Sequence, residues 1–372
     1  MIVGLPKEVK NNEFRVGMVP ASVFELTHRG HHVLVESGAG LGIGIDDAEY
    51  QKVGAEIVSD TKEVFQRSNM IVKVKEPQPD ECRMLREDQI LFTYLHLAAD
   101  LEQTTLLQAS GCIAIAYETV TDRLGRLPLL SPMSEVAGRM SIQAGAHSLE
   151  KTQGGSGVLL GGVPGVAPAK VVVIGGGVVG TNAIRMAMGM EANVTVLDRS
   201  LDRLRELDLQ FGSKLTTIYA TRHALERYVA SADLVVGAVL IPGAAAPKLV
   251  TAAMLKTMRP GSVIVDVAID QGGCFETSHP TTHENPTFVK DGVVHYCVAN
   301  MPGAVPETST FALNNATLPF IIALADKGYK QALCDDTYLL QGLNVYHGQI
   351  TSEAVAKALS MAYVSAESVL KC

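Results

Sequence analysis

The segment VVVIGGGVVG at residues 171–180 constrains the fold of this chain more than any other stretch, because an apolar run leads directly into a Gly-x-Gly-x-x-Gly pattern. Gly175, Gly177 and Gly180 supply the three positions of that pattern. In a strand–turn–helix unit such glycines allow a tight turn, close approach of the backbone to a pyrophosphate, and close packing of helix on strand. The segment therefore predicts a dinucleotide-binding unit that begins near the middle of the chain, with a different task for the residues before it.

A second expected strand, NVTVLD, follows the glycine pattern and ends at Asp198. An acid at this place accepts hydrogen bonds from ribose hydroxyls and repels a 2′-phosphate, which favours NAD. Arg199 and Arg203 keep NADP open as an alternative. A tight strand–helix turn without a ligand is the purely structural interpretation.

The composition limits the classes of partner. The chain has 372 residues, enough for two domains, and a net charge of −8 with no basic run. That charge argues against nucleic acid and against an anionic membrane surface. The apolar stretch 157–180 is interrupted by Pro164, Pro168 and Lys170, so we expect no continuous membrane helix there. We expect no signal peptide, and six cysteines without Cys-x-x-Cys spacing predict buried thiols of a reducing cytoplasm.

Short apolar runs alternate with helical segments in both halves of the chain. The strands expected are 2–5, 33–36, 70–74, 90–95 and 113–117, then 171–174, 194–198, 233–239, 262–267 and 293–298. A helix is expected at 20–29, with Pro at its start and Gly30 at its end. Such alternation is typical of parallel strands with crossover helices. The sequence therefore predicts an α/β protein with two open, mainly parallel, Rossmann-like sheets.

The tail after residue 306 looks helical and shows no strand series of its own. Pro319 is expected to kink or divide the tail helix, which should end near Gly328. Another helix is expected at 134–151, with Ser134 as its N-cap. The Gly- and Pro-rich segment that follows is either a mobile lid or a surface loop. The tail should pack on the first domain, so the substrate domain comprises 1–130 and 307–372, with the NAD-binding domain 131–306 inserted.

Polar residues end three of the expected first-half strands. These are Lys75, His96 and Glu118, and Arg15 lies in the loop after the first strand. Because ligands of open parallel sheets bind outside the carboxyl ends of the strands, these groups should face one crevice. Each alone is compatible with a solvated strand end. Together, two cations and an imidazole indicate a site for a small acid with a reactive carbon.

The second half contributes acids in the segment VIVDVAIDQGG. Asp266 lies inside an apolar run, and Asp270 lies just past it, where a nicotinamide is expected. Asp270 could instead be a turn residue before Gly272 and Gly273. Cys274, His279 and His283 form a possible metal set, but their spacing is no standard zinc pattern, and a loop is favoured over a metal site.

Long motifs along the whole chain make a family resemblance specific. They include GLPKEVKNNEFRVGMVP, VKVKEP, YLHLA, SPMSEVAGRM, the glycine turn, GAVLIPGAAAPKLV, VDVAIDQGGCFETS, VANMPGAVPETST and GLNVYHGQIT. On these motifs the chain resembles the alanine dehydrogenase family, which also contains the NAD-binding alpha subunit of proton-translocating transhydrogenase.

The resemblance implies a function and a set of site residues. Arg15 and Lys75 would bind substrate, and His96 and Asp270 would be catalytic. NAD would be held by Ser134, Gly175, Gly177, Val178, Val179, Gly180, Asp198, Arg203, Val239, Leu240, Val267, Val298, Ala299, Asn300 and Met301. The implied reaction is reversible oxidative deamination of L-alanine to pyruvate and ammonium, through hydride transfer from Cα, an iminium ion and a carbinolamine.

Further implications concern assembly and alternatives. A cytoplasmic homohexamer without a nucleic acid or membrane partner is implied. His279 and Ala220 depart from the residues that relatives often have, which bears on cofactor affinity. Three alternatives stay open: a transhydrogenase-type subunit that passes hydride to a partner, a dehydrogenase for glycine or another amino acid, and a catalytically silent NAD sensor.

Overall fold

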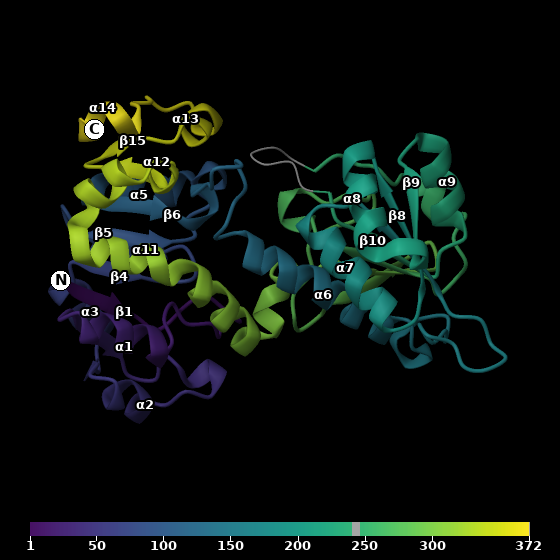
Figure 1. Cartoon of the computed structure of the whole chain (residues 1–372), viewed down its shortest axis with the longest axis horizontal. Helices are drawn as coiled ribbons and strands as arrows, with labels where there is room; N and C mark the ends of the chain where they lie inside the picture. Colours follow the sequence, from purple (N-terminus) through teal and green to yellow (C-terminus); the bar gives the residue numbers. More distant parts are fainter. Residues whose placement is uncertain (240–245, 372) are drawn as a thin grey trace. The chain divides into compact units, whose positions relative to one another are not determined.

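The computed structural model describes residues 1–239 and 246–371 and divides them into two compact units (Figure 1). The first unit comprises Met1–Met133 and Val305–Cys372, and the second comprises Ser134–Ala304. The junctions expected from the sequence lie near residues 130 and 306. The chain thus leaves the first unit, forms the second, and returns.

The first unit contains an eight-stranded sheet in the order β15-β14-β6-β5-β4-β1-β2-β3. The strands from β1 to β6 are parallel. Their bounds are β1 Ile2–Leu5, β2 His32–Glu36, β3 Glu56–Val58, β4 Met70–Val72, β5 Ile90–Thr93 and β6 Ile113–Ala116, followed by β14 Leu343–Tyr346 and β15 Gln349–Ile350. The five strands expected from the sequence, β1, β2, β4, β5 and β6, are mostly buried, which explains their continuous apolar runs.

The expectation that the tail contains no strands is wrong. β14 pairs antiparallel with β6, and β15 folds back on β14. Two left-handed residues, His347 (φ 46°) and Gly348 (φ 79°), make the two-residue turn between them. Hairpin turns of this kind need positive φ at both central residues, so the His-Gly pair in VYHGQI was the available signal.

Helices cover the first sheet. They are α1 Pro20–His28, α2 Asp47–Lys52, α3 Thr61–Arg67, α4 Pro79–Met84, α5 Leu101–Ser110, α11 Pro306–Asp335, α12 Thr337–Leu340, α13 Glu353–Leu359 and α14 Ala366–Leu370. Asp60 and Asp100 cap α3 and α5 by accepting hydrogen bonds from backbone N–H groups. A buried cluster that includes Phe65, Leu91 and Val345 lies beneath them, so tail residues complete the core of the first unit.

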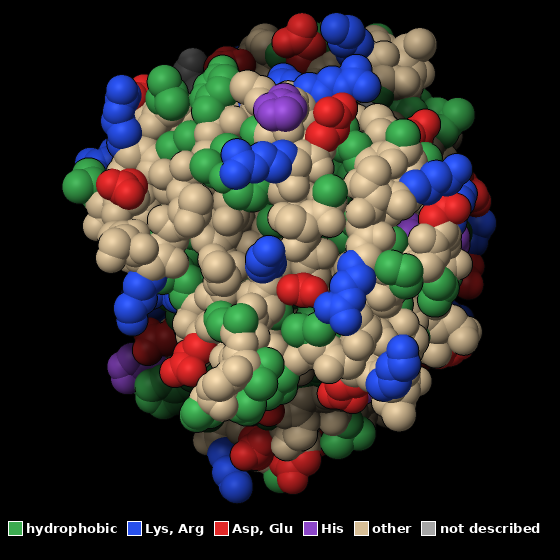
Figure 2. All heavy atoms as spheres, turned by 90° about the vertical axis from the view of Figure 1, so that its right-hand side faces the viewer, with side chains coloured by type: hydrophobic (Ala, Val, Ile, Leu, Met, Phe, Trp, Pro, Cys, Tyr) green, Lys and Arg blue, Asp and Glu red, His purple; other side chains and the backbone are tan. Residues whose placement is uncertain are grey.

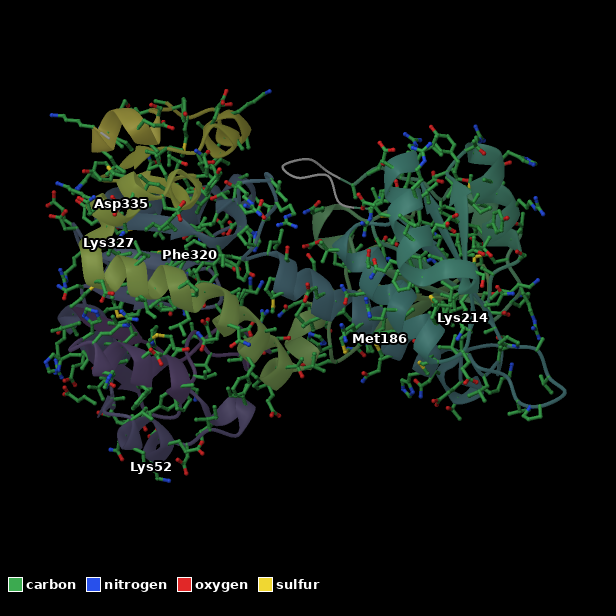
Figure 3. All side chains as sticks on the ribbon, in the orientation of Figure 1. Lys52, Met186, Lys214, Phe320, Lys327 and Asp335 are labelled. Carbon is green, nitrogen blue, oxygen red and sulfur yellow. The ribbon has the colours of Figure 1, made fainter. Side chains whose placement is uncertain are left out.

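The tail helix α11 lies against the sheet of the first unit (Figure 1). Pro319 does not divide it: the chain passes Pro319 with helical φ/ψ, and the break falls at Gly328 (φ 73°, ψ 162°). Lys327 and Asp335, labelled in Figure 3, form a 2.6 Å ion pair across that break. By length and composition α11 is the one helix of the described residues that could cross a membrane, and 44% of its apolar window is buried within the protein.

The second unit contains a seven-stranded sheet in the order β12-β13-β11-β10-β7-β8-β9, parallel except for β12. The strands are β7 Lys170–Ile174, β8 Asn193–Asp198, β9 Leu215–Tyr219, β10 Leu234–Gly237, β11 Val263–Asp266, β12 Thr287–Lys290 and β13 Val293–Tyr296. The helices are α6 Ser131–Ser148, α7 Val178–Gly189, α8 Leu201–Phe211, α9 Arg222–Ala230 and α10 Ala252–Leu255. β9 and β12 were not expected from the sequence, because both are partly exposed edge strands without a continuous apolar run.

The helix that joins the two units begins earlier than expected. α6 starts at Ser131, so Ser134 lies within its first turn and is not its N-cap, and the helix ends at Ser148. The segment after it contains a short 3₁₀ turn, Lys151–Gln153, and a bridge between Val163 and Val166. Residues 157–180 do not form one continuous helix, since they include β7 and only the first residues of α7, as expected.

Charges of both signs are interspersed on the face of the second unit that Figure 2 shows. On this unit Arg205 pairs with Asp202 at 2.6 Å and Arg222 pairs with Glu226 at 3.0 Å. Exposed i,i+3 and i,i+4 pairs of this kind contribute only about 0.3–0.5 kcal/mol each. They place an acid beside Arg205 and Arg222.

The cysteines follow the expectation in part. Cys82, Cys112, Cys274 and Cys297 are buried thiols, and burial raises the pKa of Cys112 to about 11. Cys334, in contrast, is half-buried and disulfide-bonded, so the expectation of buried thiols throughout is wrong at this position.

Candidate functional site

Each sheet has one point at which the order of its strands reverses direction along the sheet. Open α/β sheets bind ligands beside such a point. In the first sheet this point lies between β1 and β4, and in the second between β7 and β10. Arg15 is in the loop after β1, and Lys75 follows β4 closely. The two substrate-binding candidates therefore come from the strands that flank the reversal in the first unit.

Arg15 is 3% exposed and is held by a neighbouring acid. Its Nε and Nη2 donate to the two carboxylate oxygens of Glu13 at 2.6 Å, and its Nη1 lies 3.1 Å from the sulfur of Met133. Burial alone would lower the pKa of Arg15, but Glu13 outweighs it and raises that pKa. The guanidinium therefore stays charged, with its forked side turned to Glu13.

The tail helix supports the loop that carries Arg15. Thr310 Oγ1 accepts from the backbone N–H of Val16 at 3.3 Å, and Asn314 Oδ1 accepts from that of Val19 at 3.0 Å. Ser22 donates to the same Asn314 oxygen at 2.6 Å. Asn314 is 1% exposed, so these bonds are sheltered from water. The return of the chain to the first unit thus fixes the Arg15 loop as well as completing the core.

A pocket of about 310 Å³ opens beside Arg15 within the first unit. Two cations and two carboxylates line it together with apolar and glycine residues: Lys7, Glu8, Glu13, Phe14, Arg15, Gly38, Ala39, Leu41 and Gly42. The volume suits a small molecule rather than a polymer.

A buried ion cluster underlies Lys75. Lys73, 1% exposed, lies 3.1 Å from Glu8 and 2.7 Å from Glu81, both also buried. The second oxygen of Glu8 accepts from the backbone N–H of Val74 at 2.6 Å. One ammonium thus pairs with two buried carboxylates. Burial raises the pKa of Glu8, although the charge of Lys73 acts to lower it. The cluster anchors the backbone that leads to Lys75.

Lys75 itself is the more accessible lysine, with an 18% exposed side chain. Its ammonium lies 4.0 Å from a carboxylate oxygen of Glu76. Burial lowers the pKa of Lys75, and the charges of Arg15 and Lys10 add to that effect. An ammonium in such surroundings gives up its proton more readily than a solvated lysine.

His96 is exposed and has left-handed backbone geometry, with φ 53° and ψ 34°. For a residue other than glycine this geometry costs roughly 1–3 kcal/mol. Glu118 holds the turn: it accepts from the N–H of His96 at 2.6 Å and from that of Leu95 at 3.2 Å. The imidazole stacks on Tyr94 with ring centroids 5.9 Å apart. Glu118, one of the polar strand ends expected to face the crevice, is therefore a partner of the His96 loop.

The glycine turn in the second unit fits a dinucleotide. Gly175 has φ 98°, and a Cβ on Gly180 would lie 1.8 Å from the carbonyl oxygen of Gly175. In contrast, nothing lies within 4 Å of the Cβ position of Gly177, which is exposed and leads into the N-terminus of α7. Two glycines are required by the turn and its packing, and the third leaves the backbone open to a pyrophosphate.

Asp198 and Arg203 are both bonded to this turn. Asp198 accepts from the N–H of Gly176 at 2.7 Å and from that of Ser200 at 2.8 Å. Arg203 donates to the carbonyl of Gly176 at 2.6 Å and to Thr181 Oγ1 at 2.6 Å. Asp198 ends β8 as expected, and each carboxylate oxygen keeps a second lone pair for a ribose hydroxyl.

The remaining cofactor-binding candidates lie mostly after strands of the second sheet. Val239 follows β10, Val267 follows β11, and Val298, Ala299, Asn300 and Met301 follow β13. Leu240 lies outside the described residues, and Ser134 is in the first turn of α6. His283 donates a ring N–H to the carbonyl of Asn300 at 2.8 Å and so supports that stretch. Ala220 bonds through its N–H to the carbonyl of Asp198 at 2.9 Å.

Asp270 is exposed on a 3₁₀ turn, Ile269–Gln271, after β11. Asp266, which is fully buried, accepts from the N–H groups of Cys274 at 3.0 Å and Phe275 at 3.3 Å, and burial raises its pKa. Lys248 donates to the carbonyls of Gly272 and Phe275. The two acids thus have different environments. Asp266 is buried and holds the loop by hydrogen bonds, whereas Asp270 lies exposed on the turn after β11.

The residues of the possible metal set have separate partners. The Cys274 thiol lies 3.6 Å from the carbonyl of Val239, His279 stacks on Phe288 at 3.8 Å, and His283 bonds Asn300. Within the described ranges no group of three His, Cys, Asp or Glu residues could hold a metal ion.

The chain forms two doubly wound units, and the second carries a glycine turn of the dinucleotide-binding kind. Two family models match the chain: "Alanine dehydrogenase/PNT, N-terminal domain" over residues 4–137 and "Alanine dehydrogenase/PNT, C-terminal domain" over residues 141–353. The chain belongs to the alanine dehydrogenase/PNT family.

Relatives are similar over their whole length. An alanine dehydrogenase of Halomonas elongata is 58% identical over 100% of both chains, and one of Bacillus subtilis is 56% identical over 100% of this chain and 98% of its own. The solved structure of an L-alanine dehydrogenase matches with a TM-score of 0.94 and 53% identity, over 97% of this chain and 99% of that one. A transhydrogenase from Sinorhizobium meliloti matches with a TM-score of 0.83 and 25% identity, over 94% and 100%.

Proposed function

We propose that this protein is an NAD-dependent L-alanine dehydrogenase, which converts L-alanine reversibly to pyruvate and ammonium. The observation that supports this proposal most strongly is 58% identity over the full length to a relative named alanine dehydrogenase. The pair Arg15 and Lys75 beside the reversal point of the first sheet supports a small anionic substrate. We further propose that residues 1–130 and 307–372 form the substrate domain and that 131–306 hold the cofactor.

The substrate-binding residues divide the work by charge. Glu13 orients the guanidinium of Arg15, which would bind the substrate carboxylate. The ammonium of Lys75 would polarise the C=O or C=N bond at the reacting carbon. Its lowered pKa suits a group that meets an anionic ligand, because binding of the carboxylate makes the charged form favourable again.

Proton transfer falls to His96, since histidine is the side chain that enzymes use most often as a general acid or base. When NAD is bound, it accepts the hydride that leaves Cα. His96 would take a proton from the water that attacks the resulting iminium, and would return one as the carbinolamine collapses to pyruvate and ammonia. Asp270 would stabilise the cationic iminium through its opposite charge.

The cofactor would be held by the glycine turn, Asp198 and the residues after β10, β11 and β13. Gly177 leaves room for the pyrophosphate, and Asp198 can accept from a ribose hydroxyl. Arg203 is bonded to the turn itself, which favours it as a support for the turn over a ligand for a 2′-phosphate.

The lowered pKa of Lys75 predicts how pyruvate binding depends on pH. As pH rises, Lys75 should lose its proton below the ordinary lysine range near 10.4, and the dissociation constant of pyruvate should then increase. Lys75→Arg should remove this increase, since the guanidinium stays charged. The measurement is pyruvate binding to the enzyme with NADH, in the absence of ammonium, from pH 7 to 10. A pyruvate affinity that stays constant over that range would exclude the ammonium role.

Cofactor choice should depend on Asp198. Wild-type protein should prefer NAD to NADP strongly, because the carboxylate repels a 2′-phosphate. Asp198→Ala should narrow the ratio of kcat/KM values by at least about tenfold, or roughly 1.4 kcal/mol. Asp202→Ala, an exposed acid on α8, is the matched control and should leave the ratio unchanged. Equal efficiency of wild type with both cofactors would contradict this assignment.

A substrate panel separates the alternatives. Purified protein should form NADH with L-alanine in the absence of any partner, and should reduce pyruvate faster than glyoxylate when ammonium is present. Faster glyoxylate reduction would indicate a glycine dehydrogenase. NADH formation only in the presence of a partner would indicate the transhydrogenase-type role. Binding of NAD without turnover would indicate an NAD sensor. The solved-structure similarities favour the first outcome, with TM-scores of 0.94 against 0.83.

We extend the proposal to assembly and location. A cytoplasmic homohexamer is what the family resemblance implies, and the net charge of −8 without a basic run supports the lack of nucleic acid or anionic membrane partners. Sedimentation at several protein concentrations tests the hexamer.

A further inference from the structure

We infer that Glu118 is a positioning residue, which keeps the imidazole of His96 in its reactive orientation by clamping the left-handed turn beneath it. The inference rests on the proposed function, because it assigns Glu118 a part in the proton transfers of His96. Glu118 lies on a 3₁₀ turn, Tyr117–Thr119, directly after β6, beside the strand that leads to His96.

The hydrogen bonds carry the inference. Both oxygens of Glu118 accept from Leu95 N–H at 3.2 Å, and one also accepts from His96 N–H at 2.6 Å. A charged acceptor makes such bonds about twice as strong as neutral ones. Two successive backbone donors that converge on one carboxylate fix the direction in which the chain leaves β5. The positive φ of His96 persists because this contact compensates for its cost.

Two further contacts complete the support around the turn. The side-chain amide of Gln103 donates to the carbonyl of Leu95 at 3.0 Å. The peptide group between Leu95 and His96 is therefore bonded through its carbonyl as well as through its N–H. The Tyr94 hydroxyl donates to the carbonyl of Leu129 at 2.5 Å and thereby fixes the ring on which the imidazole stacks at 11°. Leu95, Gln103 and Tyr94 are all buried, whereas His96 is exposed. A buried, hydrogen-bonded support thus presents an exposed imidazole.

The chemistry explains why the support is a carboxylate. General acid–base catalysis requires the imidazole nitrogen within hydrogen-bond reach of the proton it transfers. Misplacement by about 1 Å can cost about 100-fold in rate. Without Glu118 the turn would lose its acceptor for two N–H groups, and the left-handed residue would relax toward ordinary backbone geometry. Substrate and cofactor contacts, made by other residues, would persist.

The test is a double-mutant cycle on the full-length protein. Glu118→Gln keeps the size and one acceptor oxygen, and Glu118→Ala removes the clamp. We expect kcat for L-alanine to fall by about 10- to 100-fold in Glu118→Ala and by less in Glu118→Gln. KM for pyruvate and NADH affinity should change by less than about threefold. In the His96→Ala background, Glu118→Ala should lower kcat no further, because no imidazole remains to be positioned.

Asp100→Asn is the matched control. Asp100 is an exposed carboxylate close to the same turn that caps α5 through the N–H of Gln103 at 2.9 Å and does not bond Leu95 or His96 N–H. It should leave kcat within about twofold. If Glu118→Ala lowers kcat equally in the wild-type and His96→Ala backgrounds, Glu118 is merely structural and the inference is wrong. Wild-type protein without alanine turnover would instead overturn the proposed function, so the two failures are distinguishable.

Discussion

His96→Ala and Asp270→Asn should each lower kcat for L-alanine oxidation by at least about 100-fold, the usual scale for loss of a group that transfers protons or stabilises transition-state charge. NADH affinity should stay near the wild-type value in both variants. Arg15→Ala should act differently, mainly by raising KM for alanine and pyruvate, because it removes binding that substrate and transition state share. Steady-state kinetics in both directions, together with NADH titration, measure these effects.

His147→Ala provides the control for the histidine variant. His147 lies on α6 with a 62% exposed side chain, and its loss should not change kcat. If Asp270→Asn retains most of the wild-type kcat, Asp270 is a turn residue before Gly272 and Gly273, and the charge-stabilising role is excluded.

Lys73→Met should destabilise the protein by about 3–5 kcal/mol, since it leaves two buried carboxylates without their cation. The loss should be larger at pH 8 than at pH 5. Burial raises the folded-state pKa of Glu8, so the stability present below its unfolded-state pKa is lost as pH rises through the higher folded-state pKa. Denaturant unfolding at fixed protein concentration and two pH values measures both effects.

Lys75→Met is the matched control for Lys73→Met. The Lys75 ammonium is partly exposed and its ion pair is long, 4.0 Å, so its loss should cost less than about 1 kcal/mol. Adding Glu8→Gln and Glu81→Gln to Lys73→Met should recover part of the stability, because no uncompensated charge remains. Equal losses in the two lysine variants would show that the buried cluster contributes no more than a surface pair.

Much of the fold was predictable because its central strands are buried on both sides. β1 runs from Ile2 to Leu5 as expected, and β4, β5 and β6 begin where their apolar runs begin. The ends were less predictable: β4 ends at Val72, although Lys73 and Val74 keep backbone hydrogen bonds with Phe92 and Tyr94. Edge strands such as β9 and β12 have mixed burial and therefore no clear pattern, and β14 depends on a partner far away in the sequence.

The sequence predicted the candidate residues that follow strands. It did not predict the side chains that hold those residues in place. Lys75 and His96 follow β4 and β5 closely, which the apolar runs of the sequence predict, and Arg15 lies in the loop after β1. The ion pairs could not be predicted from periodicity, because they require proximity in three dimensions. They join Arg15 to Glu13, and Lys73 to Glu8 and Glu81. In VKVKEP nothing in the sequence distinguishes the buried Lys73 from the accessible Lys75, since alternation gives both the same face.

Transfer of deuterium from L-[2-²H]alanine to NAD tests the central claim most directly. Purified protein, without any partner, should produce NADH with one deuterium at C4 of the nicotinamide, and one pyruvate and one ammonium for each NADH. That outcome requires hydride to pass directly from Cα of alanine to the cofactor. Unlabelled NADH, or no NADH without a second protein, would contradict the assignment of this protein as an L-alanine dehydrogenase.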